Sequence, residues 1–399
     1  MGEERFNRFI GAFEEEAPTS IRVNPKYSLA VGERDIVSWC PEGYYLEGRP
    51  QFTFDPLFHA GCYYVQEAAS MFILHVLRSL LPIASCPSPL HVLDLCAAPG
   101  GKSTAMRTVL PEGSVLVSNE PIANRAQILL ENITKWGWPN CIVTNNYPRD
   151  FRKAKLKFDV ILCDVPCSGE GMFRKDPATI SEWSMQNVEK CWRLQREIVA
   201  DAWECLNPGG LLIYSTCTFN TKENEGNVRW IIDTYDAEAL NIPIDPSWNI
   251  TGSLLPGFDA PVYRFISGIT RGEGLFLCAI RKKGTPPKLG GDRGGLNKGL
   301  FKSQNQSFFR PLLSPLNLGG EHEPKIDVPY PEALKYLRGE ALVLPPDTPK
   351  GMVTISYKGF ALGPAKNIGN RANNLYPKPW RIKTTHLPDE APKVLLNDE

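Results

Sequence analysis

The chain has 399 residues, and its 44 lysine and arginine side chains are balanced by 44 aspartate and glutamate side chains. The length allows two or three domains, and the balanced charge gives no indication of nucleic-acid binding. The 11 cysteines form no secreted disulfide pattern, no apolar run is long enough to cross a bilayer, and the charged first residues do not resemble a signal peptide. A protein of a reducing, cytoplasmic compartment is therefore expected, and the cysteine and histidine spacings predict no metal site.

The first 85 residues mix aromatic residues, proline and glycine, and they predict a small α+β region. A helix is expected over 3–15, and short strands are expected around 20–23 and 51–54. Apolar residues recur at helical spacing over 63–81, which predicts a second helix. The stretch 82–89, rich in helix breakers, separates this region from the next.

Short apolar runs alternate with helical patterns from residue 86 to residue 283. Strands are expected, with helices between them, at 91–95, 114–119, 141–144, 158–163 and 211–214. Such alternation predicts an α/β domain with a doubly wound, mostly parallel sheet. The run at 275–280 predicts one further strand at an antiparallel edge.

The rest of the chain divides into a linker and a small domain. Residues 284–330 are rich in Gly, Pro, Ser and Asn, which is typical of a linker. After Pro331, short apolar runs separated by glycine, the first of them Tyr336-Leu337, predict strands and hence a β-rich domain over 331–399.

Basic residues dominate two stretches of this C-terminal part, 281–302 and 350–383. A single stretch of this kind more often marks a solvated surface. Two stretches interleaved with aromatic residues favour RNA or DNA binding, because phosphates attract the basic groups.

A glycine-containing loop follows the first strand of the predicted sheet. It comes after Asp94 and reads Cys96-Ala97-Ala98-Pro99-Gly100-Gly101-Lys102. Taken alone, it is as consistent with a tight strand–helix turn as with a cofactor loop. Polar residues also follow the later strands, and an acid after the second strand commonly binds ribose hydroxyls. Together with Glu120, Asn145, Asn146 and Asp164, the loop therefore predicts a binding site for a nucleoside-bearing cofactor.

Two cysteines lie where strands of the predicted sheet end. Cys167 follows Asp164-Val165-Pro166, and Cys217 follows Ser215-Thr216. Because the carboxyl ends of parallel strands meet at one edge of a sheet, both thiols should face one crevice. A thiolate that adds to position 6 of cytosine activates position 5 for methylation, and a carboxyl group at ring nitrogen 3 stabilises the charge that develops. The spacing does not rank the two thiols, and most buried cysteines are inert apolar filler.

Three segments in this order resemble the Sun/RsmF-type RNA cytosine-5 methyltransferases: 94–103 (Asp-Leu-Cys-Ala-Ala-Pro-Gly-Gly-Lys-Ser), 164–169 (Asp-Val-Pro-Cys-Ser-Gly) and 215–218 (Ser-Thr-Cys-Thr). Further similarities cover most of the chain and are weakest in the linker. Residues 20–24 and 63–70 are similar to the N-terminal signatures of the family and residues 272–276 to its closing motif. The tail after 336–340 is similar to the PUA-like RNA-binding module of RsmF-type members.

The resemblance implies a Rossmann-like methyltransferase domain that uses S-adenosylmethionine. It implies that loop 96–102 surrounds the methyl donor, that Glu120 binds its ribose, and that Asp164 lies near both donor and base. Asn146 stands where many relatives carry an acid near the adenine. Cys217 is implied as the nucleophile and Cys167 as the group that assists product release, whereas DNA cytosine-5 methyltransferases use the Pro-Cys cysteine as nucleophile.

The resemblance also implies an RNA substrate, and ribosomal RNA is favoured over transfer RNA by the RsmF-like tail. A monomer without metal is expected. Arg22 and Asn24 are candidates for RNA contact or for a structural turn. The alternatives are a transfer RNA cytosine-5 methyltransferase, an exocyclic-amine methyltransferase that needs no cysteine, and a non-catalytic RNA-binding assembly factor.

Overall fold

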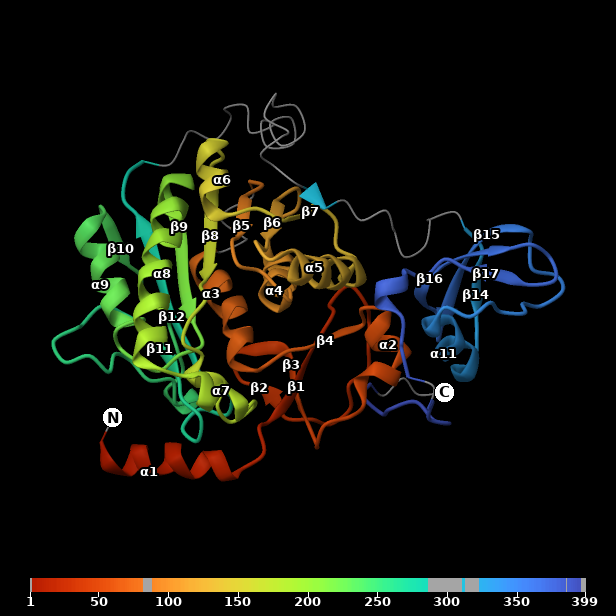
Figure 1. The fold of residues 1–399 in the computed structure, drawn as a ribbon, viewed down its shortest axis with the longest axis horizontal. Coiled ribbons are helices and arrows are strands. Elements are labelled where there is room, and N and C mark those ends of the chain that lie inside the picture. Colours follow the sequence, from red (N-terminus) through yellow and green to blue (C-terminus); the bar gives the residue numbers. More distant parts are fainter. Residues whose placement is uncertain (1, 82–87, 286–310, 313–322, 385, 396–399) are drawn as a thin grey trace.

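The computed structural model describes residues 2–81, 88–285, 311–312, 323–384 and 386–395. They form an N-terminal region, a central α/β domain and a β-rich C-terminal domain (Figure 1). In these ranges, no helix is long and apolar enough to cross a membrane. Most of the predicted linker lies outside them, and so do several of its basic and aromatic residues: Lys288, Arg293, Lys298, Phe301, Lys302, Phe308 and Phe309.

The N-terminal region begins with helix α1 (Glu3–Gly11) and contains an antiparallel sheet with the strand order β2-β3-β1-β4. Its strands are β1 (Thr19–Val23), β2 (Ile36–Val37), β3 (Cys40–Leu46) and β4 (Tyr63–Val65). The short helix α2 (Pro56–His59) precedes β4, and helix α3 (Phe72–Leu80) leads into the central domain.

One prediction for this region is wrong, and another is confirmed only in its second half. The expected strand at 51–54 is a 3-10 turn, because the amides of Phe54 and Asp55 bond back to the carbonyls of Gln51 and Phe52. The expected helix over 63–81 starts only at Phe72, since Tyr63–Val65 pairs as β4 with β1. Pairing with a neighbouring strand overrides the local helical pattern here.

The central sheet contains five parallel strands in the order β9-β8-β5-β6-β7. They are β5 (His91–Asp94), β6 (Val115–Asn119), β7 (Cys141–Thr144), β8 (Phe158–Asp164) and β9 (Leu206–Thr216). The helices between and after them are α4 (Gly101–Val109), α5 (Ala123–Trp136), α6 (Pro148–Lys153), α7 (Ala178–Glu182), α8 (Met185–Cys205) and α9 (Glu225–Thr234). The prediction of a doubly wound, mostly parallel sheet is confirmed. Its order reverses between β5 and β8, the switch point where such sheets bind ligands.

Antiparallel strands extend the sheet at both ends. Strand β12 (Leu275–Lys282) pairs with β9, as the run at 275–280 predicts. It is not the edge of the sheet, because β10 (Ala237–Ala239) and β11 (Tyr263–Phe265) both pair with it. At the opposite end, β13 (Pro311–Leu312) pairs with β7.

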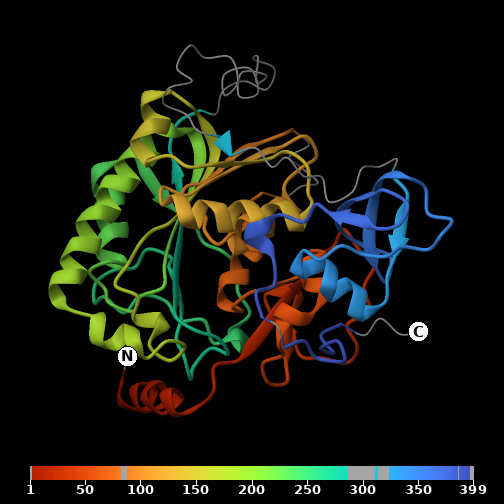
Figure 2. The same ribbon diagram turned by 45° about the vertical axis from the view of Figure 1, so that its right-hand side comes forward.

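Helices cover both faces of the central sheet (Figures 1 and 2), and an apolar core lies on each face. One face packs against α3 and α4, with Ile73, Leu77 and Met106 in a shared core. The other face packs against α8 and α9, with Val199 and Ile231 in its core. Alternate residues of the strands point to the two layers, as expected of strands that are buried on both sides.

The C-terminal domain contains helix α11 (Tyr330–Arg338) and a sheet with the order β14-β15-β16-β17. Its strands are β14 (Lys325–Asp327), β15 (Gly351–Tyr357), β16 (Phe360–Asn367) and β17 (Ala372–Asn374). The β-rich prediction is confirmed, but Tyr336-Leu337 lies in α11, because apolar residues at helical spacing bury one face of that helix. The domain lies beside the N-terminal region (Figures 1 and 2) and shares an apolar core with it.

Candidate active site

The two thiols predicted to face one crevice are in contact. Asp164 and Ser215 are opposite each other where β8 and β9 end, and the loops that follow carry Cys167 and Cys217. Their Sγ atoms are 3.2 Å apart, and the Cys217 amide points at Cys167 Sγ from 3.4 Å. The carboxyl ends of two neighbouring parallel strands therefore bring together side chains that are far apart in the sequence.

The pKa values of the two thiols are shifted in opposite directions. The hydrogen bond between them lowers the pKa of Cys217 and, against the cost of burial, leaves it below its ordinary value. The same bond, together with burial, raises the pKa of Cys167 well above its ordinary value. This difference favours Cys217 as the thiol that ionises first and Cys167 as the thiol that keeps its proton.

Asp164 lies between a cation and a hydroxyl group at the end of β8. Lys102 Nζ is 2.8 Å from its Oδ2, and Ser215 Oγ donates a 2.6 Å hydrogen bond to its Oδ1. Burial alone would lower the pKa of Lys102, but the carboxylate of Asp164 outweighs burial and raises it. The ion pair fixes the positive charge of Lys102, from the glycine loop, at the start of the loop that carries Cys167.

Polar side chains hold the two cysteine loops together, and three of them, Glu223, Gln195 and Asn220, lie outside the motifs of the sequence. The Glu223 carboxylate accepts hydrogen bonds from Ser168 N at 3.1 Å, Gln195 Nε2 at 2.6 Å and Asn220 Nδ2 at 2.7 Å. Ser168 Oγ and Thr218 Oγ1, each one residue beyond a cysteine, are 2.8 Å apart. Gln195 lies on α8, so its role could not be inferred from its place in the sequence.

The predicted cofactor loop forms the turn from β5 into α4. Gly100 has φ of 113°, in the left-handed region that favours glycine, and Gly101 is the first residue of α4. The carbonyl of Ala98 accepts a hydrogen bond from Arg125 Nη2 at 3.0 Å, and that of Pro99 accepts one from Asn132 Nδ2 at 2.8 Å. Burial raises the pKa of Cys96, in the same loop, well above its ordinary value, so this thiol stays neutral.

Asn119 joins the ends of three strands and was also not predicted. Its Nδ2 donates to the carbonyls of Leu95 and Asn146, and its Oδ1 accepts from Thr144 Oγ1 and from the Asn146 amide. The distances lie between 2.9 and 3.0 Å. The sequence could have indicated Asn119 only as a polar residue at the end of the buried strand Val115–Asn119. Its hydrogen-bond partners depend on the order of the strands in the sheet.

Two buried carboxylate oxygens at this edge of the sheet accept no hydrogen bond from the residues that the structure describes. One is Oδ1 of Asp94, whose pKa burial raises to about 7. The other is Oε2 of Glu120, which has Arg125 Nη1 at 3.4 Å but no hydrogen-bond donor. Buried acceptors without donors are costly, and hydroxyl or amino groups of a nucleoside would satisfy them. The residues present therefore fit the predicted cofactor.

Other predicted contact residues have clear positions. The main chain of Asn146 bonds to Asn119, whereas the Asn145 side chain donates to the carbonyls of Glu120 and Pro121. Arg22 and Asn24 are buried, which corrects the suggestion of direct RNA contact. Arg22 bonds to Gln66 and to Thr104 of α4, and Asn24 bonds to the carbonyls of Gly61 and Trp136. They fasten the N-terminal region to the central domain.

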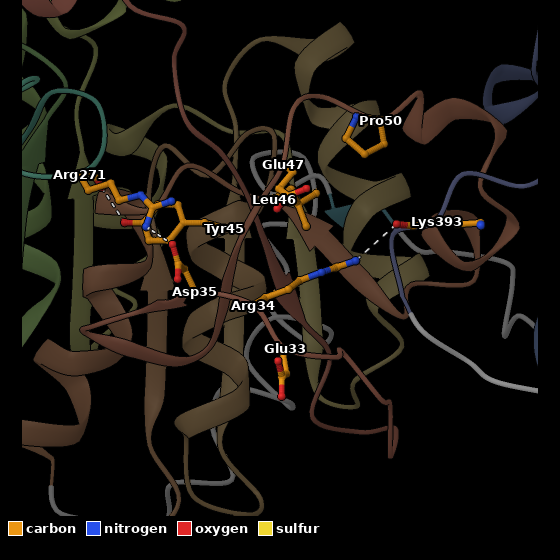
Figure 3. Close-up of a pocket in the computed structure, with 9 residues that line it drawn as sticks. All are labelled: Glu33, Arg34, Asp35, Tyr45, Leu46, Glu47, Pro50, Arg271 and Lys393. Atoms are coloured by element: carbon orange, nitrogen blue, oxygen red, sulfur yellow. Dashed lines mark hydrogen bonds and ion pairs between the residues drawn. The ribbon is translucent and has the colours of Figure 1, made fainter.

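A cavity of about 790 Å³ lies elsewhere, beside the N-terminal sheet (Figure 3). Both charge signs line it, with Arg271 stacked on Tyr45 and paired with Asp35 at 2.7 Å. None of the predicted site residues is among its lining residues, which are Glu33, Arg34, Asp35, Tyr45, Leu46, Glu47, Pro50, Arg271 and Lys393. The thiol pair, and not this cavity, is therefore the candidate active site.

The strand order, the glycine turn and the carboxylates beside it define the central domain as a doubly wound, Rossmann-like domain with a nucleoside-binding edge. Three family models match the chain in the order expected. The N-terminal domain of 16S rRNA methyltransferase RsmF matches residues 1–68, 16S rRNA methyltransferase RsmB/F matches 87–280, and the PUA domain of methyltransferase RsmF matches 323–382. The chain belongs to this RsmB/F family of S-adenosylmethionine-dependent methyltransferases.

Individual relatives agree with the family models. The ribosomal RNA small subunit methyltransferase F of Escherichia fergusonii is 33% identical over 71% of this chain, and the alignment spans 61% of that protein. The protein of the same name from Enterobacter sp. strain 638 is 28% identical over 94% of this chain and 92% of its own length. The predicted domain boundaries at 85, 283 and 330 stay predictions.

Solved structures show the same fold. The methyltransferase homolog protein of Pyrococcus horikoshii has a TM-score of 0.57 and 28% identity, over 70% of this chain and 91% of its own. NSun6 of Pyrococcus horikoshii also has a TM-score of 0.57, with 22% identity over 71% of this chain and 96% of its own, and it supports the fold alone.

Proposed function

We propose that the protein methylates position 5 of a cytosine in small-subunit ribosomal RNA through a covalent adduct at Cys217. The relatives named above act on small-subunit ribosomal RNA, and the C-terminal domain resembles a PUA module. The observation that carries the chemistry is the contact of the two thiols at 3.2 Å, in which the pKa of Cys217 is lowered and that of Cys167 is raised. An exocyclic-amine methyltransferase would need neither thiol.

In the proposed reaction, Cys217, Asp164 and Cys167 have separate roles. Cys217 Sγ adds to position 6 of the extruded base, while Asp164, oriented by Lys102 and Ser215, steadies ring nitrogen 3. S-adenosylmethionine supplies an electrophilic methyl group to position 5. After transfer, a base takes the proton from position 5, the double bond between positions 5 and 6 re-forms, and Cys217 leaves carbon 6 as a thiolate; Cys167 assists this elimination.

The methyl donor would be held at the carboxyl end of β5 and β6. The loop 96–102 would surround it, Glu120 would accept hydrogen bonds from its ribose, and Asn146 would lie near its adenine. The unsatisfied oxygens of Asp94 and Glu120 support this placement. So does the buried Asn119, because it fixes the loops after β5 and β7 relative to each other.

The proposal is tested by trapping the adduct. Purified Cys167→Ala protein is mixed with ribosomal RNA in one sample and transfer RNA in another, with S-adenosylmethionine, and both are run on denaturing gels. A denaturant-resistant RNA–protein band is expected with ribosomal RNA, because the adduct forms but is not released. The Cys167→Ala/Cys217→Ala double variant should give none.

Each outcome separates one alternative. A band that forms only with transfer RNA would show that transfer RNA, and not ribosomal RNA, is the substrate. Methylation that survives Cys217→Ala would contradict the covalent mechanism, and adduct formation by Cys217→Ala protein would exchange the roles of the two thiols. Folded protein that binds S-adenosylmethionine yet neither traps nor methylates either RNA would favour a non-catalytic assembly factor.

A further inference from the structure

The loops that carry the two thiols are bonded to each other on both sides of the sulfur atoms. Before the cysteines, the Val165 amide donates to the Ser215 carbonyl at 3.0 Å. Directly after the cysteines, the hydroxyl groups of Ser168 and Thr218 are 2.8 Å apart. The two chain segments therefore run side by side at the thiols, and the course of the main chain accounts for the 3.2 Å contact of the sulfur atoms.

The two loops also approach each other closely a few residues beyond the thiols. The Gly171 amide donates to the Cys217 carbonyl at 2.7 Å, and a Cβ atom at this glycine would lie only 2.5 Å from the same oxygen. The Glu170 carboxylate accepts hydrogen bonds from the amides of Phe219 and Asn220 at 2.8 Å each. These bonds keep the two sulfur atoms together whether or not a substrate is bound.

Both thiols of the pair are free and half-buried, so a small oxidant has access to them. A disulfide bond brings its sulfur atoms to about 2.05 Å, so an approach of roughly 1 Å closes the gap, and small rotations about the side-chain bonds supply it. Cys141 of β7 is also free and half-buried, but its Sγ lies 3.7 Å from the Pro139 carbonyl oxygen. It offers a matched control cysteine outside the site.

We propose that Cys167 and Cys217 form a redox-modification site. A peroxide joins them in an intramolecular disulfide bond, which removes the nucleophile and stops methylation until a thiol reductant opens the bond again. The formation of the disulfide depends on the geometry of the pair alone. Its effect on methylation rests on the proposed function.

Hydrogen peroxide supplies the two-electron oxidation. It converts one thiol of the pair to a sulfenic acid, Cys–SOH, and is itself reduced, with release of one water. The sulfur of the other cysteine then attacks the sulfenic sulfur: the S–S bond forms, the S–O bond breaks, and the oxygen leaves as a second water with the remaining thiol proton. Because the second thiol is already in contact, this step is intramolecular and precedes irreversible oxidation to a sulfinic acid.

The test is peptide mass spectrometry of full-length protein treated with hydrogen peroxide. The remaining thiols are blocked with N-ethylmaleimide, and the protein is digested with trypsin in the absence of reductant. Trypsin cuts at Arg174, between the two cysteines, and fragment spectra identify the joined sulfurs, since each peptide also contains a buried cysteine. We expect a peptide pair joined through Cys167 and Cys217, two hydrogen atoms lighter than the separate peptides, which dithiothreitol separates. Cys141 should not be joined to either.

Methylation of ribosomal RNA links the modification to function. In samples treated with increasing peroxide, methylation should fall in proportion to the joined fraction and return to its starting level with dithiothreitol. Cys141→Ser should show the same joined peptide and the same loss. Cys167→Ala has no second thiol at the site, so peroxide should oxidise Cys217 beyond the sulfenic acid, and dithiothreitol should not restore adduct trapping.

Two results would overturn the proposal. One is the absence of the joined peptide at peroxide concentrations that oxidise Cys141 or either cysteine of the pair. The other is undiminished methylation by protein in which the pair is fully joined. Wild-type protein gives both results, so no variant has to fold. If the reduced protein methylates neither RNA, the proposed function fails, while the joined peptide still decides whether the disulfide forms.

Discussion

Removing Arg264 should destabilise the protein by about 4 kcal/mol. Its guanidinium is buried and pairs with the equally buried Glu225 through Nε at 2.8 Å and through Nη2. Its Nη1 also donates to the carbonyl of Phe219, two residues beyond Cys217, at 2.9 Å. In Arg264→Met protein, the Glu225 carboxylate would lose the donors of the guanidinium and keep the Leu254 amide, which lies 3.0 Å from its Oε1.

The magnitude follows from the buried charge that the substitution strands. Breaking a buried ion pair by removing one partner costs about 3–5 kcal/mol, mainly because the remaining charge is uncompensated. A loss of about 4 kcal/mol corresponds to roughly a thousandfold change in the unfolding equilibrium. Replacing both partners, as in Arg264→Met/Glu225→Leu, removes the stranded charge, so the double variant should recover most of the lost stability.

Urea unfolding followed by tryptophan fluorescence measures these differences, provided that the slope of the transition is unchanged. Arg193→Met is the control, because Arg193 is 70% exposed in its pair with Glu189 and such exposed pairs contribute less than about 1 kcal/mol. The reasoning would be refuted by a cost for Arg264→Met as small as that of the control. It would equally be refuted by a double variant no more stable than Arg264→Met.

Two further predictions concern catalysis and pH. Lys102→Met should lower the rate of methylation by about 10²-fold or more, because Asp164 loses its cation and the Cys217 thiolate loses a favourable charge. The control is Lys190→Met, at an exposed position. Equal initial velocities for Lys102→Met and the control would contradict the role of Lys102. Burial and Lys135 lower the pKa of His59 from 6.5 to about 3. Between these values the unfolded chain binds a proton that the folded chain does not, so stability should fall with falling pH by up to about 1.4 kcal/mol per unit. Urea titrations should show a shallower fall for His59→Gln, and identical slopes would assign the effect to other groups.

The sequence predicted the parts of the site that lie at strand ends. Apolar runs locate β8 and β9, and Cys167 and Cys217 follow them at offsets that the parallel sheet turns into contact. The glycine turn and Lys102 follow β5 for the same reason. Periodicity and sheet geometry are local rules, and they suffice for positions that lie one turn beyond a strand.

The supporting side chains could not be predicted in this way. Gln195 reaches the Cys167 loop from the middle of α8, and Asn119 bonds across three strand ends. These contacts depend on how helices pack and on strand order, which no short window of sequence contains. The ranking of the thiols was likewise available only from the resemblance, since the pKa difference depends first on the contact between two thiols that lie far apart in the sequence.

The two halves of the site satisfy their buried polar groups in opposite ways. On the thiol side, the carboxylates of Glu170 and Glu223 are saturated with amide donors, and the loops are thereby fixed in one arrangement. On the cofactor side, Asp94 and Glu120 each keep one buried oxygen that has no donor in the described part of the chain, at a cost of about 1–3 kcal/mol for each group. Saturated groups suit a pair of sulfur atoms whose geometry must be ready before the base arrives. Unsatisfied groups suit a ligand that enters and leaves, because the donors of the ligand relieve the cost only while it is bound.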